Sequence, residues 1–174
     1  LNRIDFKLSN TDKILISCGR INQVKGWELI IDSFNILIQK DKNFKLFFIG
    51  DGEDRSKLEE KINKYNLSNQ VKIIGFQTPN QVLEWTNLAD IVLVGSYKEG
   101  WSISMLEALA CGKPIVSTNV SGAKEMIKTA ENGFIVDSRI PQKYADKLLD
   151  CLELKNHKDI SLSIANKYSL MTLK

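Results

Sequence analysis

Short, continuous apolar runs alternate along the chain with longer segments in which apolar and polar residues are mixed. The runs predict β-strands without the in/out alternation of a half-exposed sheet. Strands of a parallel sheet have this pattern, because helices cover both faces and bury both sides of every strand. The predicted strands cover residues 14–16, 46–49, 71–74, 91–94, 115–116 and 134–136.

The mixed segments between the strands predict helices. After the first strand, the apolar residues Trp27, Ile30, Ile31, Phe34 and Leu37 follow the i, i+3, i+4, i+7 spacing of one helix face. Further helices are expected at residues 53–65, 80–88, 104–111, 122–128 and 141–152. This alternation predicts an α/β fold, a Rossmann-like doubly wound parallel sheet of about six strands with right-handed crossovers.

The length and composition of the chain fit one such domain. Its 174 residues are 43% hydrophobic and 26% charged, which supplies a core and excludes a disordered, collagen-like or coiled-coil chain. Residues 1–174 are therefore expected to form a single domain. Because Leu1 is no initiator and the C-terminal residues lack a clear stop, we expect this domain to be part of a longer protein.

Charge and the rare residue types narrow the possible chemistry. A net charge of +3 is too small to indicate binding of nucleic acid. His157 is the single histidine of the sequence, which gives no basis for a histidine-based catalytic triad or a metal site with several histidines. Three cysteines at wide spacing, without a signal peptide or an apolar run long enough for a membrane span, predict buried reduced thiols in a cytoplasmic protein.

The loop after the first strand could bind an anion. Ligands of doubly wound sheets bind beyond the carboxyl ends of the strands, and this loop runs from Gly19 to Gly26 into a helix. Free N–H groups and the helix dipole converge at a helix start, and Arg20 and Lys25 add two cations that suit a diphosphate. A solvated loop with two surface charges fits equally well. The spacing is neither that of a P-loop nor that of a dinucleotide fingerprint.

Acidic residues mark two further loops. The loop Gly50-Asp51-Gly52 favours a tight turn that caps the next helix over a phosphate contact. Glu99 follows the fourth strand, and Glu107 lies within the apolar helix that comes next. A carboxylate in such surroundings needs a partner, and the vicinal hydroxyls of a sugar or ribose are suitable ones. Exposure of both carboxylates to solvent is the alternative.

Five motifs together resemble a known family. They are Gly19-Arg20-x4-Lys25-Gly26, Gly50-Asp51-Gly52, Glu99-Gly100-x6-Glu107-Ala108-x-Ala110-Cys111-Gly112-x-Pro114-Ile115-Val116, Ser121-Gly122-x2-Glu125 and Asn132-Gly133-Phe134-Ile135-Val136. In this order they are similar to the C-terminal, nucleotide-sugar-binding half of the retaining GT-B glycosyltransferases, glycosyl transferases group 1. The resemblance covers about residues 2–170, and residues 2–5 resemble the end of that family's interdomain linker.

The resemblance implies roles for the matching positions. Arg20 and Lys25 would hold the donor diphosphate, and Glu107 would bind the ribose hydroxyls. Glu99 would contact the transferred sugar near the reacting centre, so Glu99, Arg20 and Lys25 are the expected catalytic residues. The nucleobase would rest near residues 72–74, and residues 100–104 would act through backbone amides. The expected donor-binding set is Gly19, Arg20, Lys25, Lys72, Ile73, Gly100, Trp101, Ser102, Ile103, Ser104 and Glu107.

Two positions depart from the family pattern. Trp101-Ser102 stands where the family often has Phe-Gly, and Ser121-Gly122 replaces a Gly-Gly pair. We expect Trp101 to be a packing or sugar-stacking variant. Ser121, Gly122 and Glu125 are expected to be structural.

The resemblance also implies a function. The chain would be the donor-binding half of a retaining glycosyltransferase that moves a sugar from a UDP- or GDP-sugar to a glycan, a lipid-linked acceptor or another acceptor. The N-terminal acceptor domain would be absent from this chain, so the isolated domain would bind donor but transfer little. No metal or cofactor is implied, and the protein would be a bacterial, cytoplasmic enzyme of polysaccharide biosynthesis, at most peripheral on the inner membrane face. A nucleotide-sugar epimerase or phosphorylase of the same architecture, or a non-catalytic nucleotide-sugar-binding module, remains as an alternative.

Overall fold

A computed structural model describes residue 6 and residues 8–171, the side chains of 169–171 excepted. Its centre is a sheet in which every pair of neighbouring strands is parallel. The order of the strands across the sheet is β3-β2-β1-β4-β5-β6. The strands are β1 (Lys13–Cys18), β2 (Phe44–Ile49), β3 (Val71–Gly75), β4 (Ile91–Val94), β5 (Ile115–Thr118) and β6 (Gly133–Val136). The predicted doubly wound α/β fold is confirmed.

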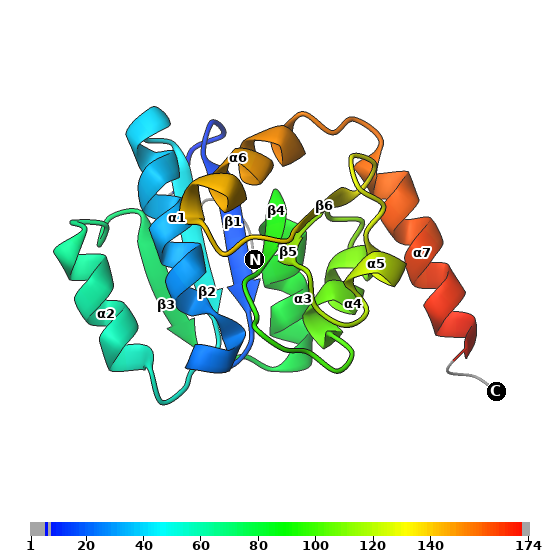
Figure 1. Ribbon diagram of the computed structural model, residues 1–174, viewed down its shortest axis with the longest axis horizontal. Coiled ribbons are helices and arrows are strands. Elements are labelled where there is room, and N and C mark those ends of the chain that lie inside the picture. Colours follow the sequence, from blue (N-terminus) through cyan, green and yellow to red (C-terminus); the bar gives the residue numbers. More distant parts are fainter. Residues whose placement is uncertain (1–5, 7, 172–174) are drawn as a thin grey trace.

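Helices connect the strands and cover both faces of the sheet (Figure 1). They are α1 (Trp27–Lys40), α2 (Arg55–Lys64), α3 (Pro79–Leu88), α4 (Ile103–Ala110), α5 (Ala123–Met126), α6 (Pro141–Leu152) and α7 (His157–Met171), with the short 3-10 helix η2 (Gln23–Lys25) before α1. The sequence prediction missed α7, whose apolar residues form no clear stripe and which packs against α4. In the described part of the chain, no helix is both long and apolar enough to cross a membrane.

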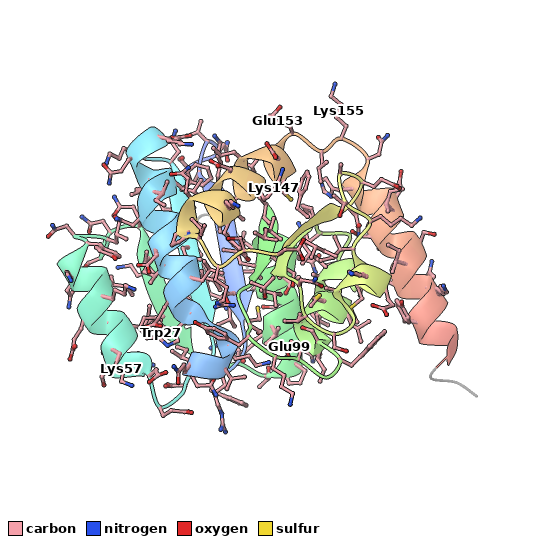
Figure 2. The ribbon with its side chains drawn as sticks, in the orientation of Figure 1. Trp27, Lys57, Glu99, Lys147, Glu153 and Lys155 are labelled. Carbon is pink, nitrogen blue, oxygen red and sulfur yellow. The ribbon has the colours of Figure 1, made fainter. Side chains whose placement is uncertain are left out.

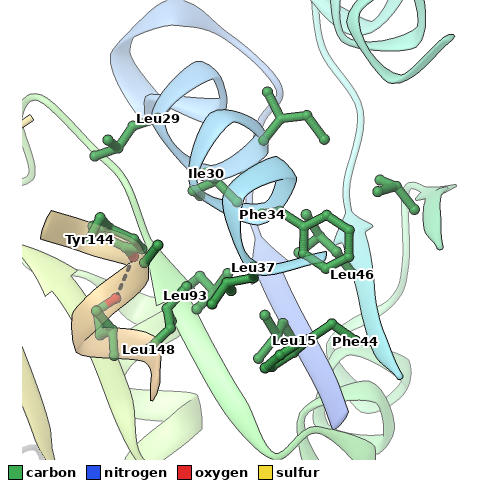
Figure 3. Close-up of a cluster of buried hydrophobic side chains, with 14 of the residues drawn as sticks. Leu15, Leu29, Ile30, Phe34, Leu37, Phe44, Leu46, Leu93, Tyr144 and Leu148 are labelled. Atoms are coloured by element: carbon green, nitrogen blue, oxygen red, sulfur yellow. Dashed lines mark hydrogen bonds between the residues drawn. The ribbon is translucent and has the colours of Figure 1, made fainter. Parts of the chain in front are cut away.

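The two helix layers enclose separate cores. Leu15 of β1 faces the layer of α1 and α6, where Phe34 and Tyr144 are fully buried (Figure 3). The neighbouring residue Ile16 faces the opposite cluster, which includes Trp85 of α3. Because successive residues of β1 enter different cores, the strand is apolar throughout, which explains the missing alternation in the sequence.

The strand order reverses between β1 and β4. The chain runs outward from β1 through β2 to β3 and then returns to β4 on the other side of β1. The connections that follow β1 and β4 therefore lead away in opposite directions along the sheet, and the crevice at which such folds bind ligands lies between the carboxyl ends of these two strands. The strand arrows in Figure 1 place this edge at the bottom of the view.

Candidate active site

A cleft of about 520 Å³ lies at the carboxyl ends of the strands. Its walls come from the loops after β1, β2, β3 and β4 and from α4. The predicted site residues that line it are Gly19, Arg20, Lys25, Glu99, Trp101, Ser102, Ile103, Ser104 and Glu107. Figure 2 shows Glu99 at this edge and Lys155 at the opposite edge of the molecule. The structure thus brings most of the predicted residues to one place.

Lys25 and Glu99 form an ion pair across the crevice. The Lys25 Nζ donates to both carboxylate oxygens of Glu99, at 2.8 and 2.9 Å. The hydroxyl of Ser96 donates to Oε1 of the same carboxylate at 2.6 Å. The Glu99 side chain is only 9% exposed, whereas that of Lys25 is 38% exposed. In the free protein the cation and the acid of the predicted site therefore neutralise each other.

Local turn chemistry positions Lys25. The Asn22 side chain caps η2 by accepting from the Lys25 backbone N–H at 3.0 Å. Gly26, with φ +65°, is both the C-cap of η2 and the N-cap of α1. It lies against the end of β4, because a Cβ added to Gly26 would come within 1.9 Å of the Gly95 carbonyl oxygen. The two loops thus approach each other backbone to backbone.

Two groups near this pair are free to meet an anion. Arg20 lines the cleft, is exposed, and makes no hydrogen bond or ion pair with any described residue. At the start of α4 the Ser102 side chain makes no capping bond to the helix, and its hydroxyl lies 3.1 Å from that of Ser104. The uncapped N–H groups of the first turn and the exposed guanidinium suit a diphosphate.

Glu107 also lines the cleft, from α4. It is half-buried, and its side chain forms no hydrogen bond with a described residue. Burial raises the pKa of this carboxyl above its ordinary value. Burial also raises the pKa of the nearby Cys18 thiol to about 12, with the Glu107 charge as a further cause, so this thiol stays protonated. An unpaired carboxylate in a cleft suits the hydroxyls of a ligand.

We expect the Glu107→Gln variant to gain stability over the wild type as the pH rises. When the pKa of a carboxyl is higher in the folded than in the unfolded chain, the carboxyl ionises more easily in the unfolded chain. The free energy of unfolding therefore falls as the pH rises from the unfolded-state pKa to the folded-state pKa. Urea unfolding from pH 3.5 to 7 measures the difference, which should be smallest at the acid end. Glu60→Gln, which removes an exposed carboxylate, is the control. A difference that stays constant with pH would contradict this expectation.

The structure places two of the residues predicted to lie near the nucleobase outside the cleft. Lys72 donates to the Ser68 carbonyl at 2.9 Å, toward the start of β3, and neither Lys72 nor Ile73 lines the cleft. The reason is that β3 continues to Gly75, so its carboxyl end lies at Phe76 and Gln77, which do line the cleft. Phe76 is 81% exposed there. In the sequence, the aromatic residue directly after the glycine that ends β3 was the available sign that the strand ends there and that Phe76 lies at the edge of the sheet.

Three other residues were assigned incompletely from the sequence. Ser96, whose hydroxyl donates to Glu99, follows Gly95 at the end of an apolar run, and nothing in the sequence pattern marks it as a site residue. Asp51 accepts from the Gly52 N–H and pairs with Arg55, as a turn residue would, yet it also lines the cleft. Gly100, expected to act through its amide, is exposed beside the lining residues.

Trp101 connects the cleft to the rest of the domain. Its ring meets the ring of Tyr168 edge to face at 5.3 Å and lies against Gly122, where an added Cβ would be 3.0 Å from it. The side chain is still 45% exposed. These contacts fit the predicted packing role, and the exposed part of the ring lines the cleft.

The chain matches known proteins over almost its whole length. The model of the family "Glycosyl transferases group 1" matches residues 2–165. An uncharacterized glycosyltransferase of Methanocaldococcus jannaschii is 36% identical over 116 residues, which are 66% of this chain and 28% of the relative. The N-acetyl-alpha-D-glucosaminyl L-malate synthase of Bacillus anthracis is 26% identical over 149 residues, 86% of this chain and 38% of that protein. The chain spans about a third of the length of these relatives.

Solved structures agree with the fold. The C-terminal domain of a glycosyl transferase group 1 family protein from Francisella tularensis has a TM-score of 0.78 at 28% identity, with 92% of this chain and 89% of that chain covered. The pneumococcal O-GlcNAc transferase GtfA, solved in complex with UDP and GlcNAc, has a TM-score of 0.81 at 21% identity over 92% of this chain and 34% of that one.

Proposed function

Because the chain belongs to the Glycosyl transferases group 1 family, we propose that it is the donor-binding domain of a retaining glycosyltransferase. Its substrate would be a UDP- or GDP-sugar, and the acceptor would be a glycan or a lipid-linked sugar bound by a domain outside this chain. The observation that carries the proposal is the meeting of Lys25 and Glu99 across the crevice between β1 and β4. In doubly wound folds that crevice is where ligands bind.

The residues of the cleft would divide the donor between them. Arg20, Lys25 and the amides at the start of α4 would hold the diphosphate and stabilise the charge that develops on it as the sugar leaves. Glu107 would accept from the ribose hydroxyls. Glu99 would contact the sugar once Lys25 has turned from it to the phosphates. This assignment is supported by the charges and the free donors of the cleft.

A nucleotide titration tests the proposal. We expect the chain to bind one of UDP, GDP or ADP in calorimetry, and not NAD. In the double variant Arg20→Ala/Lys25→Ala the affinity should fall at least about 30-fold, which corresponds to about 2 kcal/mol of lost charge-assisted contacts. The control Lys42→Ala/Lys155→Ala removes the same charge at the opposite edge of the sheet, where both lysines are exposed, and should bind like the wild type. Equal loss in both variants, or no binding by the wild type, would contradict the proposal.

The proposal also concerns the full-length protein to which this domain would belong. The full-length enzyme would be cytoplasmic, at most peripheral on the membrane, while these 174 residues alone would bind donor and transfer little. Appreciable transfer by the isolated chain would overturn that part of the proposal.

A further inference from the structure

Arg139 contacts the loop that carries Glu99 but does not itself line the cleft. It lies between β6 and α6, and its guanidinium donates to the Gly95 carbonyl at 3.0 Å and to the Ser96 carbonyl at 3.3 Å. The same guanidinium lies over the ring of Tyr97, with Cζ 3.4 Å from the ring centroid. One side chain therefore contacts three consecutive residues at the start of the 95–99 loop.

Two of these three residues connect the loop to Glu99 and to the loop that carries Lys25. The Ser96 hydroxyl donates to the Glu99 carboxylate, and the Tyr97 backbone N–H donates to the Val24 carbonyl at 2.8 Å, which joins this loop to the one that carries Lys25. The Ser96 carbonyl that accepts from Arg139 also accepts from the Thr118 hydroxyl at 2.6 Å. The loop has no helix or strand of its own between β4 and α4, so it lacks the regular backbone hydrogen bonds that would hold its shape.

An ion pair does not explain the position of Arg139. Among the residues that the structure describes, none places a carboxylate oxygen within 4.0 Å of its half-buried guanidinium. The carbonyls and the aromatic ring take the place of a carboxylate partner. The planar fork of arginine can bridge two neighbouring carbonyls, which an ammonium group cannot do in the same way.

We propose that Arg139 is a positioning residue that fixes the 95–99 loop, so that the Glu99 carboxylate faces the sugar of the donor. The inference rests on the proposed function, since it takes the ligand of Glu99 to be that sugar. It predicts that Arg139 contributes to recognition of the sugar and little to recognition of the nucleotide, which the loop after β1 and α4 would hold.

The test compares UDP with UDP-glucose, or GDP with GDP-mannose if the chain selects guanine. In Arg139→Met, which keeps an unbranched side chain but removes the guanidinium, we expect affinity for the sugar nucleotide to fall about 10-fold and affinity for the free diphosphate to change less than about 3-fold. Arg139→Lys should lie between this variant and the wild type. The control Lys147→Met also removes a cation from an aromatic ring, that of Phe134 at 5.0 Å, but contacts none of residues 95–99 and should leave both affinities unchanged.

Hydrogen exchange gives a readout that does not depend on any nucleotide. The Tyr97 amide should exchange faster in Arg139→Met than in the wild type or in Lys147→Met, because its loop has lost an anchor. Unchanged exchange, or an equal fall in both affinities, would overturn the role of Arg139. Faster exchange in a chain that binds no nucleotide would instead support the loop anchor and reject the proposed function.

Discussion

Replacing Gly26 by alanine should destabilise the domain by about 4 kcal/mol. Gly26 has φ +65°, a conformation that costs an L-residue about 1–2 kcal/mol. The added Cβ would also lie 1.9 Å from the Gly95 carbonyl oxygen and 2.7 Å from Nη2 of Arg139. Such an overlap can be relieved only if the loops after β1 and β4 move apart, and this would disrupt the backbone contact on which the site is built.

Gly100→Ala is the matched control for this substitution. An added Cβ at Gly100 would meet nothing within 4 Å, so the change should shift the free energy of unfolding by less than about 0.5 kcal/mol. Urea unfolding followed by circular dichroism measures both variants. For a domain of this size the Gly26 variant should also melt about 10 °C lower. Equal stability of the two variants would show that the close approach of Gly26 and Gly95 contributes nothing.

The sequence predicted the fold well because burial leaves a direct pattern. Ile14, Leu15 and Ile16 are apolar in succession because they enter two different cores, and such runs identify the strands of a covered parallel sheet. The helix α7 left a weaker pattern. It packs on α4, and among its described side chains Ser161 and Ile164 are the buried ones, so local periodicity gave little signal.

The site could be predicted only as far as topology decides it. The rule that ligands bind beyond the carboxyl ends of the strands brought Lys25 and Glu99 to one edge of the sheet, but it could not say that they pair. That contact depends on turn geometry at Gly26 and on the Ser96 hydroxyl. Arg139 is 43 residues from Ser96 in the sequence, and its hydrogen bond to that residue comes from the way β6 and α6 are placed in the fold, which no motif records.

Glu99→Gln should change nucleotide affinity and sugar transfer in opposite directions. In the free protein the Glu99 carboxylate holds Lys25 at 2.8 Å, so a diphosphate must separate the pair before Lys25 can bind it. The amide variant releases Lys25 and removes a negative charge beside the incoming anion. We expect affinity for the nucleoside diphosphate to rise about 10-fold, or about 1.4 kcal/mol.

Transfer by the full-length enzyme should fall in the same variant by about 100- to 1,000-fold. The expected contact of Glu99 with the sugar lies at the reacting centre, where a group aimed at developing charge contributes most in the transition state. The control Ser96→Ala removes the hydroxyl that donates to Glu99 at 2.6 Å but keeps the carboxylate, so its nucleotide affinity should stay near that of the wild type. Calorimetry on the chain and turnover of the full-length protein measure the two effects. If Glu99→Gln bound the diphosphate no more tightly than the wild type, the ion pair with Lys25 would not compete with the donor. If the variant also transferred sugar at the wild-type rate, Glu99 would have no part at the reacting centre.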